Sequence, residues 1–346
     1  MTNRENYLSL VRRQGYERVP LDFFMCPFLE KRFNEYAQEQ GIQVEFDHAH
    51  IDNGLRWITA EEEAFRRYYQ TPLPEGTTFD SYGVAYSPGS AEAYHMTQMH
   101  HPMADFDSVE QVESYPFPRL EAGPIPPADI GDRVAMGHMQ CTVWEQSWYL
   151  RGMENLMMDM MTEDPIAAAI LDRVTAISSQ NAAAYAAAGA DILFLGDDIG
   201  MQRTPMMSRE LYCQWLKPRL EKVIRAAKAV KGDILIFYHS CGYVEPFIDD
   251  LIEAGVDVLD PVQPECMDFA EIHARYGDRL SFHGTIGTQT TMPYGTPEEV
   301  RREVFRNLDI AGSRGGLLVC PTHMLEPEVP VENVAAYIEA CRDYCR

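Results

Sequence analysis

The second half of the chain alternates short apolar runs with longer amphipathic stretches, and this alternation constrains the fold more than any other feature. Five such pairs follow one another from residue 190 to the C-terminus. Apolar runs of strand length that alternate with helical stretches are typical of parallel β/α units. Two earlier runs, at 19–25 and 133–141, have the composition of further strands. We therefore predict an α/β fold, a (β/α)₈ TIM barrel with an elaborated N-terminal region.

An open doubly wound sheet is the main alternative to the barrel. No Gly-x-Gly-x-x-Gly turn follows the first predicted strand, which disfavours a dinucleotide-binding sheet. We expect one domain over residues 1–346. Within it, 1–130 hold the N-terminal elaboration and the first strand, and 131–346 hold the regular β/α units. Residues 70–130 are rich in Pro, Gly, His and Tyr and show no periodic pattern that assigns their structure.

Two helix boundaries can be predicted from local signals. The Ala-rich stretch at 164–188 should be a helix with Asp164 as N-cap and Pro165 in its first turn. The helical stretch that starts at Ser208 should kink or restart near Pro218, because proline cannot donate the intrahelical hydrogen bond.

Composition excludes several classes of partner. The formal net charge of −24 argues against nucleic acid and anionic membranes, because both are bound by clustered Lys and Arg. No apolar run approaches the roughly 20 residues of a membrane helix. The N-terminal segment lacks a secretory apolar region, so we expect a cytoplasmic protein. The eight cysteines lack a regular spacing, which predicts free thiols.

Polar side chains of chemical interest follow the predicted strands where each strand ends. They are Asp197 and Asp198, His239 and Cys241, Gln263, His283, and Cys320 and His323. In a β/α barrel these ends meet at one rim, which is where active sites of this fold lie. The sequence therefore predicts a functional site at the carboxyl-terminal rim of the barrel.

A His-x-Cys pair at the end of one strand indicates a metal site. His239 and Cys241 have strand parity, so their side chains can point to the same side of the chain. A third ligand would complete a catalytic zinc site with one open position. Cys320 and His323 are the two candidates for it. The alternative is structural: Cys241 would be a packed thiol and His239 a hydrogen-bonded core residue.

Acidic residues supply the candidates for proton transfer. Asp197 and Asp198 point to opposite faces of their strand, so at most one faces the pocket, and we choose Asp198 as the catalytic candidate. The other aspartate should cap a helix or pair with an arginine. Glu145 could carry a proton or serve as an exchangeable zinc ligand, or it could pair with Arg151.

The remaining candidates have competing structural explanations. His283 is a candidate catalytic residue that could equally be a satisfied histidine at the rim, and Gln263 is a candidate cofactor-binding residue. The methionines from Met153 to Met161 are expected to pack in the core. The histidines at 95, 100 and 101 lie in the unassigned region, and we do not expect them to bind metal. Cys341 and Cys345 receive no function.

Several motifs, in this order, resemble the uroporphyrinogen decarboxylase superfamily. They are GDDIG with SRELYCQWLKPRL, HSCG, LDPVQ, FHGTIGTQ with PYGTPEEV, and PTHMLEPEVPVEN. The resemblance implies a (β/α)₈ barrel, in a superfamily that contains decarboxylases and cobalamin-linked methyltransferases. The segment LDFFMCPFLEKRF lacks the arginine motif expected of the true decarboxylases. In the methyltransferase branch a His-x-Cys pair and a later cysteine hold zinc. Counting back from the PVEN segment places His323 at the position of that cysteine. Cys320 is favoured instead by its thiolate, which is the softer ligand.

WEQSWYLRGMENLMMDM and HSCGYVEP are most similar to enzymes that demethylate aryl methyl ethers. The resemblance implies zinc as a Lewis acid and methyl transfer from a small methoxylated donor to cob(I)alamin. No Asp-x-His-x-x-Gly signature occurs, so we expect the corrinoid on a separate partner protein. The sequence leaves open whether the protein forms a homodimer. The alternatives are methyl transfer to a thiol or tetrahydrofolate, a metal-free decarboxylase that uses Asp197 or Asp198, and a non-catalytic partner of a corrinoid protein.

Overall fold

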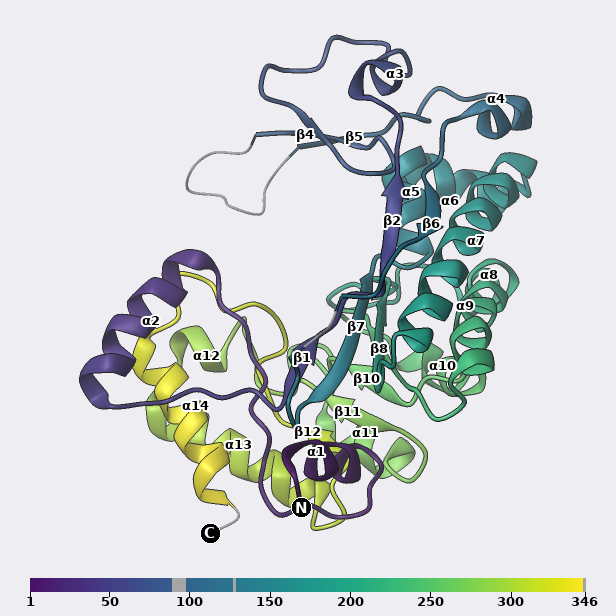
Figure 1. The fold of residues 1–346 in the computed structure, drawn as a ribbon. Helices are drawn as coiled ribbons and strands as arrows, with labels where there is room; N and C mark the ends of the chain where they lie inside the picture. Colours follow the sequence, from purple (N-terminus) through teal and green to yellow (C-terminus); the bar gives the residue numbers. More distant parts are fainter. Residues whose placement is uncertain (89–97, 127–128, 345–346) are drawn as a thin grey trace.

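The computed structural model describes residues 1–346 except 89–97, 127–128 and 345–346, so His95 and Cys345 lie outside the described residues (Figure 1). A curled sheet of seven parallel strands forms its centre, in the order β1-β7-β8-β9-β10-β11-β12. The strands are β1 (His48–His50), β7 (Val134–Gln140), β8 (Ile192–Gly196), β9 (Leu235–His239), β10 (Val258–Asp260), β11 (Ser281–His283) and β12 (Leu317–Leu318). The predicted TIM-barrel class is confirmed, with six of the seven strands inside predicted runs.

The segment at 19–25, predicted as the first strand, does not form a regular strand. It contacts the chain after β12 through one isolated parallel bridge between Met25 and Leu325. The amide of Leu325 donates to the carbonyl of Phe24 at 2.9 Å. Pro20 lacks an N–H and weakens strand pairing in this segment. The segment thus lies at the seam between the two ends of the sheet, β12 and β1.

The helices of the barrel agree with the predicted boundaries. Helix α7 (Pro165–Ala187) begins after Asp164, whose carboxylate accepts from the amide of Ile166. Helices α8 (Arg209–Trp215) and α9 (Lys217–Val230) separate at Leu216, as Pro218 predicts. The others are α5 (Trp144–Arg151), α6 (Met153–Thr162), the 3₁₀ turn Glu245–Phe247, α10 (Ile248–Ala254), α11 (Phe269–Tyr276), α12 (Thr291–Tyr294), α13 (Pro297–Ala311) and α14 (Val331–Tyr344).

The first helix, α1 (Asn3–Val11), packs against the sheet below β12 and β7 (Figure 1). Its Tyr7 and Leu10 are fully buried with inward side chains of the strands, among them Phe237 and Val258. Helix α2 (Pro27–Gln40) lies beside α14. The N-terminal helix therefore fills one end of the barrel, and any site must open at the other end.

The unassigned region at 70–130 contributes to two small antiparallel sheets. One pairs β2 (Leu55–Ile58) with β6 (Arg119–Ala122). The other has the order β3-β4-β5, with β3 (Thr78–Phe79), β4 (Ala85–Ser87) and β5 (Gln98–His100). Helices α3 (Glu62–Arg66) and α4 (Val109–Ser114) accompany them. Strands β3 to β5 and helices α3 and α4 extend away from the barrel beyond α5 and α6 (Figure 1). Within the described residues, no helix combines the length and apolar character that crossing a bilayer demands.

Candidate metal centre

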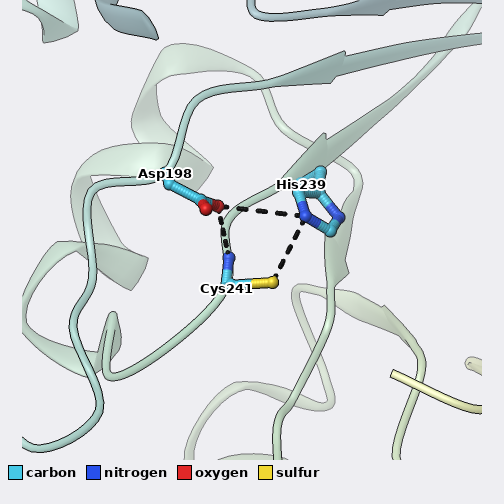
Figure 2. A group of neighbouring side chains, drawn as sticks. All are labelled: Asp198, His239 and Cys241. Carbon is cyan, nitrogen blue, oxygen red and sulfur yellow. Dashed lines mark hydrogen bonds and ion pairs between the residues drawn. The ribbon is translucent and has the colours of Figure 1, made fainter. Parts of the chain in front are cut away.

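Three side chains from two adjacent strand ends meet at the carboxyl-terminal rim (Figure 2). His239 is the last residue of β9, Cys241 follows it by two residues, and Asp198 follows β8. One ligand atom from each of the three lies within 4.8 Å of the others. Sγ of Cys241 is 3.4 Å from Nε2 of His239, and Oδ1 of Asp198 is 3.9 Å from the same nitrogen. We call these residues the first set.

Glycines allow the two loops of the first set to approach so closely. A Cβ on Gly200 would lie 2.6 Å from the carbonyl oxygen of Cys241, and one on Gly196 would lie 2.9 Å from Cβ of His239. Gly242 has a φ of +87°, which favours glycine. The predicted cofactor-binding residue Gln263 is buried, and its Oε1 accepts from the amide of Gly242 at 3.0 Å. Gln263 thus holds the loop that carries Cys241.

A chain of hydrogen bonds runs from His239 across the bottom of the site. Nδ1 of His239 donates to Asp260 at 2.7 Å, and Nδ1 of His283 donates to the other oxygen of Asp260 at 2.6 Å. Nε2 of His283 lies 3.0 Å from Asp22 and 3.3 Å from Sγ of Cys320. Cys320, a candidate third zinc ligand, therefore contacts His283, whereas Asp198 is the residue that joins His239 and Cys241.

The electrostatics of this chain depend on burial and on neighbouring charges. Burial lowers the pKa of His239, but the Asp260 carboxylate outweighs burial and raises that pKa well above its ordinary value. Burial raises the pKa of Asp260, and the two histidines overcome this and hold it below its usual range. Burial raises the pKa of the Cys320 thiol to about 11, opposed by His283.

A cavity of about 300 Å³ opens next to this chain. Its lining includes Asp22, Phe23, Phe24, His48, His50, Met136, His138, Gln140, Phe194, Phe237, His239, Asp260, His283, Cys320, Pro321, Thr322, His323 and Met324. None of these lining residues is a lysine or an arginine. His323, the other candidate third ligand, is exposed at the cavity, and its ring centroid lies 6.3 Å from that of His239.

Several cavity residues were missed by reasoning from the sequence. His50 and His138 lie on adjacent strands with ring centroids 5.6 Å apart, and His138 stacks on Phe194 at 5.0 Å. Burial, followed by the neighbouring His50, lowers the pKa of His138 to about 4. The sequence signal for them was the alternation in HAH at 48–50 and in MGHMQ, which places each histidine on one face of a strand.

Glu145 and Asp197 form a buried acidic pair behind the first set. Both carboxylate oxygens of Asp197 accept from the amide of Val143, and Oδ1 also accepts from the amide of Glu145. Asp197 therefore caps α5, which confirms that one of the two aspartates caps a helix. Burial and then the charge of Asp198 raise the pKa of Glu145 to about 7. Oε1 of Glu145 accepts from Tyr149, while Oε2 is buried without a hydrogen bond among the described residues.

Arg151 does not pair with Glu145. Its guanidinium bonds Asp159 at 2.8 Å and donates to the carbonyls of Met103, Ala104 and Phe106. The suggested Glu145–Arg151 ion pair was wrong, because the helix directs Arg151 toward the chain at 103–106.

The structure also shows the contacts of two other histidines and of the methionine stretch singled out in the sequence. His100 bonds Ser87, and His101 bonds the carbonyl of Tyr149. Within the methionine stretch Met160 is buried, but Met158 and Met161 are 60% and 67% exposed, so the expectation of core packing was wrong for these two.

Comparisons with known proteins place this fold and site in a family. The family model described as uroporphyrinogen decarboxylase (URO-D) matches residues 93–344. A methylated-thiol–coenzyme M methyltransferase from Methanosarcina mazei is 26% identical over 204 residues, covering 56% of this chain and 49% of the relative. A uroporphyrinogen decarboxylase from Coxiella burnetii is 24% identical over 175 residues, covering 51% and 46%.

The chain spans about half the length of these curated relatives. A solved structure, a methyltransferase from Methanosarcina mazei, is similar over 100% of both chains with a TM-score of 0.68 and 17% identity, which supports the fold. The chain belongs to the uroporphyrinogen decarboxylase (URO-D) family, and its relatives in that family include a methyltransferase.

Proposed function

We propose that the protein is a zinc-dependent corrinoid methyltransferase. It would take a methyl group from a small methoxylated donor, of the aromatic class, and pass it to a cobalamin carried by a partner protein. The observation that carries the proposal is the meeting of Asp198, His239 and Cys241 at the rim of the barrel. The methyltransferase among the relatives supports the same class of reaction.

The first set fits zinc by the chemistry of its donors. An imidazole nitrogen, a thiolate and a carboxylate are the ligand types of catalytic zinc sites, which keep a fourth position open. Asp260 holds Nδ1 of His239, as the carboxylate behind a zinc-bound histidine does, and so directs Nε2 toward Cys241. His323, whose ring centroid lies 6.3 Å from that of His239, would be a further ligand from the rim. Zinc bound there would supply a Lewis acid that stabilises charge on the leaving oxygen.

The residues around the first set would bind the methyl donor and hold or release a proton during the reaction. Phe194, Phe237 and Met136 give the cavity apolar walls suited to a small ring. Glu145 lies behind Asp198 with its pKa near 7, so it can hold or release a proton close to neutral pH. Phe24, 57% exposed at the cavity, would contact the corrinoid partner at the mouth of the barrel.

A metal-free decarboxylase is the second candidate, because curated relatives include uroporphyrinogen decarboxylases. The cavity speaks against a polycarboxylate substrate. Its lining includes the carboxylates of Asp22 and Asp260 and no lysine or arginine. Anionic groups bound next to these two carboxylates, with no lysine or arginine in the lining to pair with them, would be repelled. Methyl transfer to a thiol stays the nearer alternative, given the thiol substrate named for the Methanosarcina mazei relative.

The test of the proposal is methyl transfer by the zinc-loaded protein. The protein is incubated with reduced cobalamin and a panel of methoxylated aromatic compounds, and methylcobalamin is followed by its absorption. We expect methylcobalamin with at least one donor, and none with Cys241→Ala. Uroporphyrinogen serves as the competing substrate. Decarboxylation that survives in Cys241→Ala, without methylcobalamin from any donor, would replace this proposal with the decarboxylase.

A further inference from the structure

Asp260 stands between two groups of side chains that have the same composition. Its Oδ2 accepts from Nδ1 of His239, and its Oδ1 accepts from Nδ1 of His283. Each histidine then presents Nε2 to one cysteine and one aspartate. For His239 these are Cys241 and Asp198, which form the first set. For His283 they are Cys320 and Asp22.

The distances on the His283 side are as short as those in the first set. Nε2 of His283 lies 3.0 Å from Oδ2 of Asp22 and 3.3 Å from Sγ of Cys320. His48 approaches the same carboxylate, with Nδ1 3.8 Å from Oδ2 of Asp22. That nitrogen of His48 is buried and makes no hydrogen bond in the part of the chain that the structure describes. We call Asp22, His48, His283 and Cys320 the second set.

An unsatisfied imidazole nitrogen at this place indicates a missing partner. Buried polar atoms are nearly always hydrogen-bonded or bound to an ion. Asp22 and Asp260 bring two carboxylates to the same wall, where they pair with His283 and His239, and the cavity lining holds no lysine or arginine. Imidazole, thiol and carboxylate groups gathered in this way are the ligand types of zinc sites.

We propose that the second set binds a second transition-metal ion, of the zinc class. Two imidazole nitrogens, one thiolate and one carboxylate make the four-ligand combination of a closed tetrahedral site. Asp260 would hold the metal-bound His283 in the same way as it holds His239. The ligand atoms of the second set do not all lie within 4.8 Å of one another, as those of the first set do, so Asp22 or His48 would have to turn toward the ion. Binding releases the thiol proton of Cys320 and any proton on the coordinating imidazole nitrogens.

The second ion would close the seam of the barrel. His283 ends β11 and Cys320 follows β12, whereas His48 begins β1 and Asp22 lies in the segment at 19–25. These elements flank the place where the isolated bridge of Met25 with Leu325 joins the end of the sheet. A metal that links both sides replaces missing strand pairing with coordination bonds. The ion is therefore structural, and methyl transfer does not depend on it directly.

Metal stoichiometry tests the proposal without any assay of activity. The protein is stripped with chelator, reconstituted with zinc, desalted and analysed for zinc per chain, and a parallel cobalt titration follows thiolate-to-cobalt charge transfer. The variants are Cys241→Ser for the first set, Cys320→Ser and His48→Gln for the second, and Cys213→Ser as a thiol control on α8. Circular dichroism verifies that each variant is folded.

We expect about two zinc ions in the wild type and in Cys213→Ser, and about one in Cys241→Ser and in Cys320→Ser. His48→Gln should weaken one of the two binding steps by about tenfold or more. Hydrogen exchange at the amides of Cys26 and Leu325 should slow on metal loading in Cys241→Ser and not in Cys320→Ser.

One zinc ion that is lost in Cys241→Ser and kept in Cys320→Ser would overturn the second site and leave the proposed function standing. One ion that is lost in both variants would mean a single site that uses both thiols, and this would also overturn the second site. An unchanged affinity in His48→Gln would overturn the second set even if Cys320→Ser failed to fold.

Discussion

Nδ1 of His239 donates to Oδ2 of Asp260 at 2.7 Å, and this bond fixes which nitrogen of His239 faces Cys241. Asp260 is buried at the end of β10, one strand away from His239. The orientation of the proposed zinc ligand therefore depends on a neighbouring strand. A carboxylate behind a metal-bound histidine fixes the ring and raises its basicity.

Asp260→Asn should lower zinc affinity about 10- to 100-fold, because the amide cannot hold Nδ1 of His239 and Nδ1 of His283 as a carboxylate does. Competition with a chromophoric chelator measures the affinity. Asp278→Asn, at an exposed position paired with Arg314, is the matched control and should leave it unchanged. Equal affinities of Asp260→Asn and wild type would show that Asp260 does not support a metal ligand.

Gly200→Ala should disturb the first set through the backbone. The new Cβ would lie 2.6 Å from the carbonyl oxygen of Cys241 and 2.9 Å from the amide nitrogen of Tyr243, so the loop must move. We expect a loss of stability of about 1–3 kcal/mol and weaker zinc binding. Urea unfolding and the chelator competition measure the two effects. Gly232→Ala, whose Cβ would meet only an ordinary contact at 3.8 Å, should cost less than about 1 kcal/mol.

Glu145 should make the metal-free protein less stable as the pH rises. Burial raises its pKa from 4.5 to about 7, so the folded state retains a proton that the unfolded state has already lost. Stability from this group is present below about pH 4.5 and is lost as the pH rises through 7, by up to roughly 3 kcal/mol.

Glu145→Gln should remove that loss, so the variant should exceed the wild type in unfolding free energy at pH 8 and differ little at pH 5. Chelator-treated protein is unfolded with urea at both values. Glu39→Gln, at an exposed position on α2, is the control and should follow the wild type. A Glu145→Gln variant that parallels the wild type at both pH values would contradict the buried, protonated carboxyl.

Arg151 and Asp159 form an ion pair with side chains only 9% and 11% exposed. Arg151→Met should cost about 3–5 kcal/mol, since it leaves the Asp159 charge buried without its partner. The three carbonyls at 103–106 would lose their donor as well. Adding Asp159→Leu should recover part of the loss, and a double-mutant cycle in guanidinium chloride measures it. Strict additivity of the two changes would show that the pair is not coupled.

The strands of the barrel could be predicted where burial on both faces gives continuous apolar runs. The strands at LFLG, LIFYH and SFH lie within the predicted runs, and the polar residues at or just after their ends identified the rim. Strand β1 was missed because two of its three residues are histidines, which carry no apolar signal. The prediction of a strand at 19–25 was wrong, because its apolar residues pack in the core without regular strand pairing.

The partners within the site could be predicted only in part. Residue type and position identified His239, Cys241 and Asp198, which the fold brings together. Asp22, His48 and Asp260 were missed, because their importance comes from contacts across strands that are distant in sequence. Ligand chemistry could not decide whether Cys320 or His323 is the third zinc ligand, because the direction of each side chain depends on the loop after β12.

Zinc content of the wild type and of Cys241→Ala, purified without chelator and measured by mass spectrometry, tests the central claim most directly. The account predicts that the wild type holds about one more zinc ion per chain than the variant. Sulfur should appear among the zinc ligands of the wild type in X-ray absorption. Equal zinc content in the two proteins, or no bound zinc in either, would contradict it.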